Sequence, residues 1–114
     1  MTKKLWIDDV RPTPEGWDRA YTGEQAIDML ATRMYDCVSF DHDLGTCAAC
    51  ELDNNNDCRH VKNGYDVACW LEEQVATDDE FPVPHEMFVH SDNGPGRIKI
   101  SQAIASIIRI GICR

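Results

Sequence analysis

Two carboxylates flank an imidazole at Asp41-His42-Asp43, directly after an apolar run and just before a glycine. In that run Val38 and Phe40 alternate at the spacing of a buried strand, and the glycine permits a turn after it. Open parallel sheets leave a crevice at the carboxyl ends of their strands, so acceptor groups at such an end suit a metal ion or a phosphate. The alternative is that these carboxylates only cap a turn.

Two further apolar runs end in side chains of the same kind. Residues 4–7 are predicted to form a short strand that Asp8 and Asp9 follow, and residues 87–91 form another, which ends in His90 and Ser91. Strands that alternate with helices predict a parallel sheet, whose carboxyl ends lie along one edge. One site is therefore expected to gather the following side chains: Asp8, Asp9, Asp41, His42, Asp43, His90 and Ser91.

An oxygen-rich cluster of this kind favours Mg²⁺ or Mn²⁺, which share their coordination with phosphate oxygens. Pro95-Gly96, at the start of the last helix, adds backbone N–H groups that suit an anion. Arg11 lies close behind the first carboxylates in the sequence. Its guanidinium group could clamp a phosphate bidentately or form an ion pair with Asp8 or Asp9, and both interpretations stay open.

The elements that must position these residues follow from periodicity. Strands are expected at residues 4–7, 17–21, 36–41 and 87–91, and helices from residues 22–25, from 63–66 and over 98–110. Residues 92–97 are expected to form a turn. Two prolines and a glycine between residues 12 and 16 exclude a helix after the first strand.

Length, composition and charge limit the class of protein. A chain of 114 residues with 43% hydrophobic residues is expected to fold as a single globular domain, residues 1–114. No apolar run approaches the length of a membrane span. The apolar patch near the start of the chain ends at Asp8 and Asp9, so a secretory signal is not expected and a cytoplasmic protein is. The formal charge of −9 excludes non-specific binding to nucleic acid, because that needs a basic surface.

Residues 46–63 form an insertion with few bulky apolar side chains, which cannot order itself by burial. Cys47 and Cys50 have the spacing of a zinc knuckle, and Cys58 and His60 add two ligands. Four such ligands predict a closed, structural Zn²⁺ site, with a disulfide or an unligated loop as the alternatives. The remaining cysteines are expected to be buried thiols: Cys37, Cys69 and Cys113.

An acidic pair after the first strand, an aspartate after a central strand and a serine after a later one resemble the receiver domains of response regulators. In that resemblance Asp8 and Asp9 correspond to the metal-binding pair, Asp41 to the phosphoacceptor, and Ser91 to the hydroxyl that contacts the phosphoryl group. The missing first helix, and the missing fifth strand that would carry the receiver lysine, weigh against phosphorylation of Asp41.

The sequence is more similar to the cyclic-phosphate processing receiver domains. The motifs that carry this likeness are Asp8-Asp9-Val10-Arg11-Pro12, Asp41-His42-Asp43-Leu44-Gly45, Gly64-Tyr65-Asp66 and His90-Ser91-x-Asn93. The resemblance implies a three-layer, flavodoxin-like α/β fold, which the predicted zinc loop of residues 46–63 interrupts as an insertion. It also implies a role in processing cyclic phosphates rather than in a phosphorelay.

The resulting hypothesis is a divalent-metal-dependent phosphoesterase that acts on the cyclic phosphate of a nucleotide or an RNA end. The catalytic candidates are Asp41, His42, Asp43 and His90, with the two histidines as general base and acid. Mg²⁺ or Mn²⁺ would be held by Asp8, Asp9 and Asp41, and the phosphate by Arg11, Ser91, Asn93 and Arg97. The alternative is a non-enzymatic module that senses a phosphorylated ligand or a protein partner.

Overall fold

The computed structural model describes residues 3–41, 63–91 and 94–113 of the chain. In this part of the chain, four strands form one parallel sheet in the order β2-β1-β3-β4. The strands are β1 (Lys4–Ile7), β2 (Trp17–Ala20), β3 (Cys37–Phe40) and β4 (Glu86–Val89). The helices are α1 (Gly23–Thr32), α3 (Gly64–Thr77) and α4 (Gly94–Ile112). The expected α/β fold with a parallel sheet is therefore confirmed.

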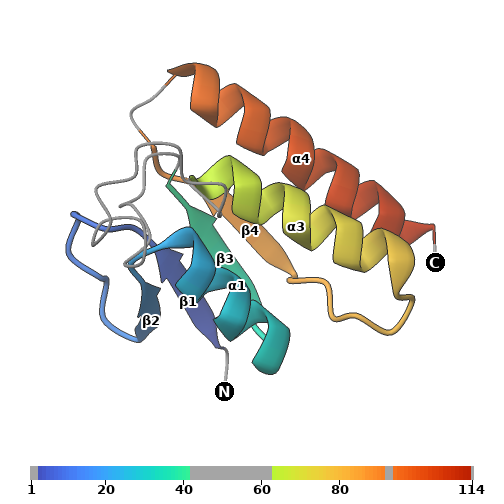
Figure 1. Cartoon of the computed structure of the whole chain (residues 1–114), viewed down its shortest axis with the longest axis horizontal. Coiled ribbons are helices and arrows are strands. Elements are labelled where there is room, and N and C mark those ends of the chain that lie inside the picture. Colours follow the sequence, from blue (N-terminus) through green and yellow to red (C-terminus); the bar gives the residue numbers. More distant parts are fainter. Residues whose placement is uncertain (1–2, 42–62, 92–93, 114) are drawn as a thin grey trace, which may run out of the picture.

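The three described helices pack on one face of the sheet, where α3 and α4 lie side by side (Figure 1). Alternate strand residues such as Leu5 and Phe40 share one buried core with Leu71 of α3 and Ile107 of α4. Each fully buried side chain of this size stabilises the fold by about 1.5–3 kcal/mol. Within the described residues the helices form one layer, so these residues do not show the expected third layer.

Side chains at the intervening strand positions point to the opposite face, because successive strand residues alternate. Trp6 of β1 pairs with Ser39 of β3, and Ser39 pairs with Phe88 of β4, so these three side chains form a row across the sheet. Phe88 is 49% exposed. The side chain of His90 lies on this second face, where it contacts Trp6 and Ser39.

Side-chain caps start the first two helices where the sequence predicts them. At α1 the hydroxyl of Thr22 accepts a hydrogen bond from the Gln25 N–H (3.1 Å), although the Gln25 side chain accepts from Tyr21 rather than from Thr22. At α3 the capping box is complete: Asn63 and Asp66 each accept the other's backbone N–H. Such caps contribute about 1 kcal/mol each.

A loop, not a helix, connects β1 to β2, as the prolines predict. Gly16 takes a φ of 86° in it, a conformation that other residues rarely adopt. The Arg19 side chain of β2 donates to the backbone carbonyl of Asp8 (3.1 Å) and lies 3.3 Å from the Thr13 hydroxyl. The loop is therefore tied to β2, and Asp8 is held at its start.

Some details differ from the sequence analysis. The last helix begins at Gly94 rather than after a turn through residue 97. Cys37 is buried as expected, whereas Cys69 and Cys113 are exposed, so the prediction for those two is wrong.

None of the described helices combines the length and apolar character that crossing a membrane requires. The predicted zinc ligands lie outside the described residues.

Candidate functional site

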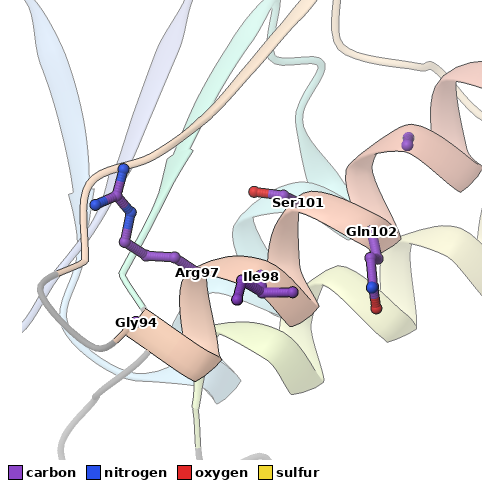
Figure 2. A pocket seen from close by; sticks show the side chains of 6 residues that line it. Gly94, Arg97, Ile98, Ser101 and Gln102 are labelled. Carbon is purple, nitrogen blue, oxygen red and sulfur yellow. The ribbon is translucent and has the colours of Figure 1, made fainter.

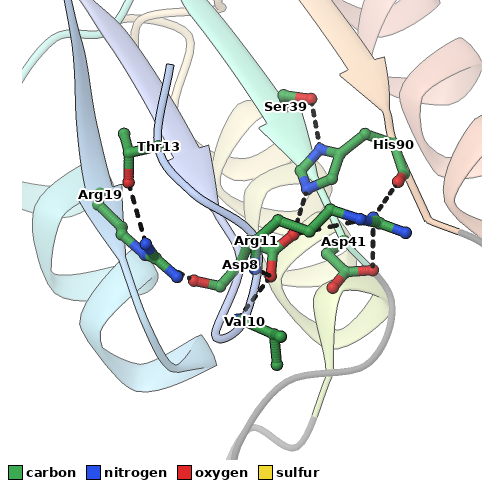
Figure 3. A network of polar contacts seen from close by, with 8 residues as sticks. All are labelled: Asp8, Val10, Arg11, Thr13, Arg19, Ser39, Asp41 and His90. Carbon is green, nitrogen blue, oxygen red and sulfur yellow. Dashed lines mark hydrogen bonds and ion pairs between the residues drawn. The ribbon is translucent and has the colours of Figure 1, made fainter. Parts of the chain in front are cut away.

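Strand register brings Asp8, Asp41 and His90 together. Ile7 of β1 pairs with Phe40 of β3, and Phe40 pairs with Val89 of β4. The residue after each of these is therefore at the same level, at the carboxyl edge of three neighbouring strands. One ligand atom from each of Asp8, Asp41 and His90 lies within 4.8 Å of the other two. Figure 3 shows the three side chains directed toward one another.

Asp8 is fully buried and held through both carboxylate oxygens. Oδ1 accepts hydrogen bonds from the backbone N–H groups of Val10 (2.8 Å) and Arg11 (2.9 Å), and Oδ2 lies 3.0 Å from Nε2 of His90. Burial raises the pKa of Asp8, but the two backbone donors and His90 outweigh it and leave the pKa below its usual value. Asp8 is thus a fixed carboxylate that is negatively charged at neutral pH.

Both ring nitrogens of His90 have partners. Nδ1 lies 2.7 Å from the hydroxyl of Ser39, and Nε2 faces Asp8. The ring also stacks on Trp6, with the centroids 3.8 Å apart and the planes 6° from parallel. Burial lowers the pKa of His90 even though Asp8 and Asp41 act to raise it, so the ring is neutral near pH 7. With an ionised Asp8 beside it, the neutral ring carries its proton on Nε2 and accepts from Ser39 at Nδ1.

Asp41 completes the group and differs electrostatically from Asp8. Burial and the neighbouring charge of Asp8 raise the pKa of Asp41, while a hydrogen bond with Ser91, the charge of Arg11 and, when its ring is protonated, His90 act in the opposite direction. Two carboxylates held this close repel each other, and a cation between them would relieve that repulsion.

Arg11 supplies part of that positive charge. Its Nη1 lies 3.8 Å from Oδ2 of Asp8 and 4.0 Å from Oδ1 of Asp41, and it donates to the backbone carbonyl of His90. The side chain is 34% exposed, so it borders the solvent at the mouth of the cluster. Of the two interpretations of Arg11, the ion pair is present, and the structure places it with Asp8 and Asp41.

The structure brings together five of the residues that the sequence assigns to the site: Asp8, Arg11, Asp41, His90 and Ser91. Asp9 is half-buried and is not part of the closest group of ligand atoms among the described residues. Arg97 is not in that group either; it is exposed near the start of α4, where it lines a pocket with Ile98 and other residues of that helix (Figure 2). The remaining candidates lie outside the described residues: His42, Asp43, Cys47, Cys50, Cys58, His60 and Asn93.

Sequence reasoning missed Ser39 and Trp6, which orient His90. A signal for both exists, because each stands two residues before a carboxylate of the site and therefore on the same face of its strand. Ser39 is also the only hydroxyl residue of β3, and it is buried. A buried polar residue within an apolar strand needs a partner, and here that partner is His90.

The donor set fits a divalent cation. It offers two carboxylates and one imidazole, and each has a further hydrogen-bond partner that fixes it: backbone N–H groups for Asp8, Ser91 for Asp41 and Ser39 for His90. Metal ligands in proteins are usually held in this way by outer contacts. The sequence expectation of a cation held by Asp8 and Asp41 is compatible with this geometry.

Comparison with known proteins gives one result. Neither the curated proteins nor the solved structures contain a match to the chain. A family model, the cyclic-phosphate processing receiver domain, matches residues 3–106. The matched region contains all four strands and every residue of the Asp8, Asp41 and His90 cluster. The chain therefore belongs to the family of cyclic-phosphate processing receiver domains.

Proposed function

We propose that the chain is a divalent-metal-dependent phosphoesterase that opens a cyclic phosphate of a nucleotide or an RNA end. The observation that carries this proposal is the meeting of Asp8, Asp41 and His90 within 4.8 Å at the edge of a parallel sheet, with Arg11 beside them. The family indicates processing of cyclic phosphates, and the site offers groups that suit a cation and a phosphate.

Asp8 and Asp41 would hold the cation, which supplies Lewis-acid polarisation of the phosphoryl oxygen and an activated water. Arg11 is placed to bind a non-bridging phosphate oxygen, because its guanidinium group borders the cluster and is partly exposed. Water adds to phosphorus and one ester P–O bond breaks. The proton that the water loses is balanced by the one that the leaving hydroxyl gains, so the product is a phosphomonoester.

Asp8 and His90 differ in what they can do for this reaction. Asp8 is charged and fixed, which suits a ligand rather than a group that exchanges protons. Both nitrogens of His90 are engaged, which weighs against its predicted role as a general acid or base. His42 and Asp43 keep their predicted catalytic roles as proposals.

Turnover of 2′,3′-cyclic AMP, measured with Mg²⁺, with Mn²⁺ and with EDTA, tests the proposal. Cation-dependent opening by the wild type, lost in D41N, is expected. D36N is the matched control, because Asp36 stands at the other end of β3, where it accepts from the backbone N–H of Lys3 (3.0 Å). Binding of the nucleotide without turnover would overturn the enzymatic proposal and support the sensing module instead.

The structural zinc of residues 46–63 is a second part of the proposal. Elemental analysis of the purified chain is expected to give one zinc per molecule, and C47A is expected to lose it. C69A is the control, because Cys69 is an exposed free thiol on α3. Zinc-free protein, or unchanged zinc in C47A, would contradict this assignment.

A further inference from the structure

The position of Nε2 of His90 is compatible with that of a metal ligand. It lies 3.0 Å from Oδ2 of Asp8, and one ligand atom from each of Asp8, Asp41 and His90 lies within 4.8 Å of the other two. Two ligands about 2.1 Å from an octahedral ion, at neighbouring positions, are separated by about 3 Å. The separation of Nε2 and Oδ2 thus equals that of two ligands on one ion.

The surroundings of His90 prepare it for that role. The ring is fixed by its stacking on Trp6, and Ser39 contacts Nδ1 at 2.7 Å. A hydroxyl accepts as readily as it donates, so Ser39 can accept a hydrogen bond from an Nδ1–H group once a cation takes the place of the proton on Nε2. The lone pair of Nε2 then points to the space that Asp8 and Asp41 also face. Metal-binding histidines are commonly oriented in this way through their other nitrogen.

We propose that His90 is the third protein ligand of the cation held by Asp8 and Asp41, so that the site selects Mn²⁺ or a similar transition-metal ion over Mg²⁺. This inference rests on the cation of the proposed function and names its class. Imidazole nitrogen is a poor ligand for Mg²⁺ and a good one for first-row transition metals, whereas carboxylates accept both. The expectation from the sequence left Mg²⁺ and Mn²⁺ open, and the donor set favours Mn²⁺.

Pulsed electron paramagnetic resonance of bound Mn²⁺ tests this ligand directly, because a coordinated ¹⁴N nucleus modulates the electron spin echo. The measurement uses the purified chain of 114 residues with one equivalent of Mn²⁺. Its variants are H90Q, H85Q and H42Q. H85Q is the matched control, since His85 is exposed at the opposite end of β4. The Mn²⁺ and Mg²⁺ affinities are measured in parallel by competition.

The expected result is a ¹⁴N modulation in the wild type, in H85Q and in H42Q, and its loss in H90Q. Mn²⁺ is expected to bind about tenfold more tightly than Mg²⁺ or better, with most of this preference lost in H90Q. Should H90Q not fold, labelling the wild type with ¹⁵N-histidine replaces it, because the ¹⁴N modulation must then disappear.

Several outcomes would overturn the inference: bound Mn²⁺ without nitrogen modulation, modulation that survives in H90Q, or no preference over Mg²⁺. These outcomes are separate from failure of the proposed function. Nitrogen-coordinated Mn²⁺ in a protein that does not turn over 2′,3′-cyclic AMP would leave the inference standing and contradict the proposed phosphoesterase activity. Turnover of the cyclic nucleotide by a protein whose Mn²⁺ has only oxygen ligands would overturn the inference and leave the proposed function standing.

Discussion

Nε2 of His90 lies 3.0 Å from Oδ2 of Asp8, although 82 positions separate the two residues in the sequence. The contact exists because β1 and β4 flank β3 in the same register, so that the residues after Ile7 and Val89 reach the same edge of the sheet. Asp41 follows Phe40 between them.

Neutralising Asp41 is expected to stabilise the metal-free protein, while neutralising Asp8 destabilises it. The pKa of Asp41 is raised by burial and by Asp8, so its charge at pH 7 opposes folding, and D41N removes that charge. The expected gain in the free energy of unfolding is about 0.5–2 kcal/mol, at the cost of function. The lowered pKa of Asp8 gives D8N the opposite sign. Urea unfolding in EDTA measures both, and a loss of stability in D41N would contradict this electrostatic account.

Removing the Ser39 hydroxyl is expected to loosen the imidazole. S39A leaves Nδ1 of His90 without its partner at 2.7 Å in a buried position, which costs about 1–3 kcal/mol of folding free energy. Mn²⁺ affinity should fall by about tenfold or more, because an outer contact of a ligand is lost. S101A is the control, since Ser101 is exposed on α4. Unchanged Mn²⁺ affinity in S39A would show that Ser39 does not position the ring.

Replacing Arg11 is expected to strengthen cation binding and weaken phosphate binding. Its guanidinium lies 3.8 Å from Asp8 and 4.0 Å from Asp41, so R11A leaves the two carboxylates more negative. Since Arg11 is partly exposed, Mn²⁺ affinity should rise only about two- to tenfold. Titration of Mn²⁺ into R11A, with R33A as the control, checks this. Arg33 pairs with Asp18 outside the cluster. Weaker Mn²⁺ binding by R11A would be inconsistent with competition between Arg11 and the cation for Asp8 and Asp41.

The stability of the metal-free protein should depend on pH through His90. Burial lowers the pKa of His90 in the folded state from 6.5, so its contribution is present above pH 6.5 and is lost as the pH falls through the folded pKa. The raised pKa of Asp41 acts in the opposite direction and is shared by H90Q. The difference in unfolding free energy between wild type and H90Q should therefore shrink from pH 7.5 to pH 5, by up to about 1.4 kcal/mol per pH unit. A constant difference would mean that burial does not lower the pKa of His90 in the folded protein.

Much of the sheet was predictable because its strands end abruptly in polar residues. Asp8, Asp41 and His90 each follow an apolar run, and parallel topology makes such ends meet. Asp9 was assigned to the same ligand set, but strand alternation favours Asp8 over its neighbour, and only Asp8 is in the cluster.

Three features differ from the predictions or were not predicted, each for a structural reason. Pro95 suggested a turn, yet proline is tolerated in the first turn of a helix, and α4 includes it. Cys69 was predicted to be buried, but the inward stripe of α3 runs through Val67, Leu71 and Val75, which leaves Cys69 outside it. The contact between Ser39 and His90 joins positions 51 apart, so no local pattern reveals it.

The most direct test of the account is a crystal structure of the Mn²⁺-loaded protein, with anomalous diffraction used to locate the ion. An Mn²⁺ peak is expected in contact with Asp8, Asp41 and Nε2 of His90, with the guanidinium group of Arg11 displaced from the space between the carboxylates. A crystal saturated with Mn²⁺ that shows no anomalous peak at this edge of the sheet, or that shows Mn²⁺ bound at a different set of residues, would contradict the proposed metal site.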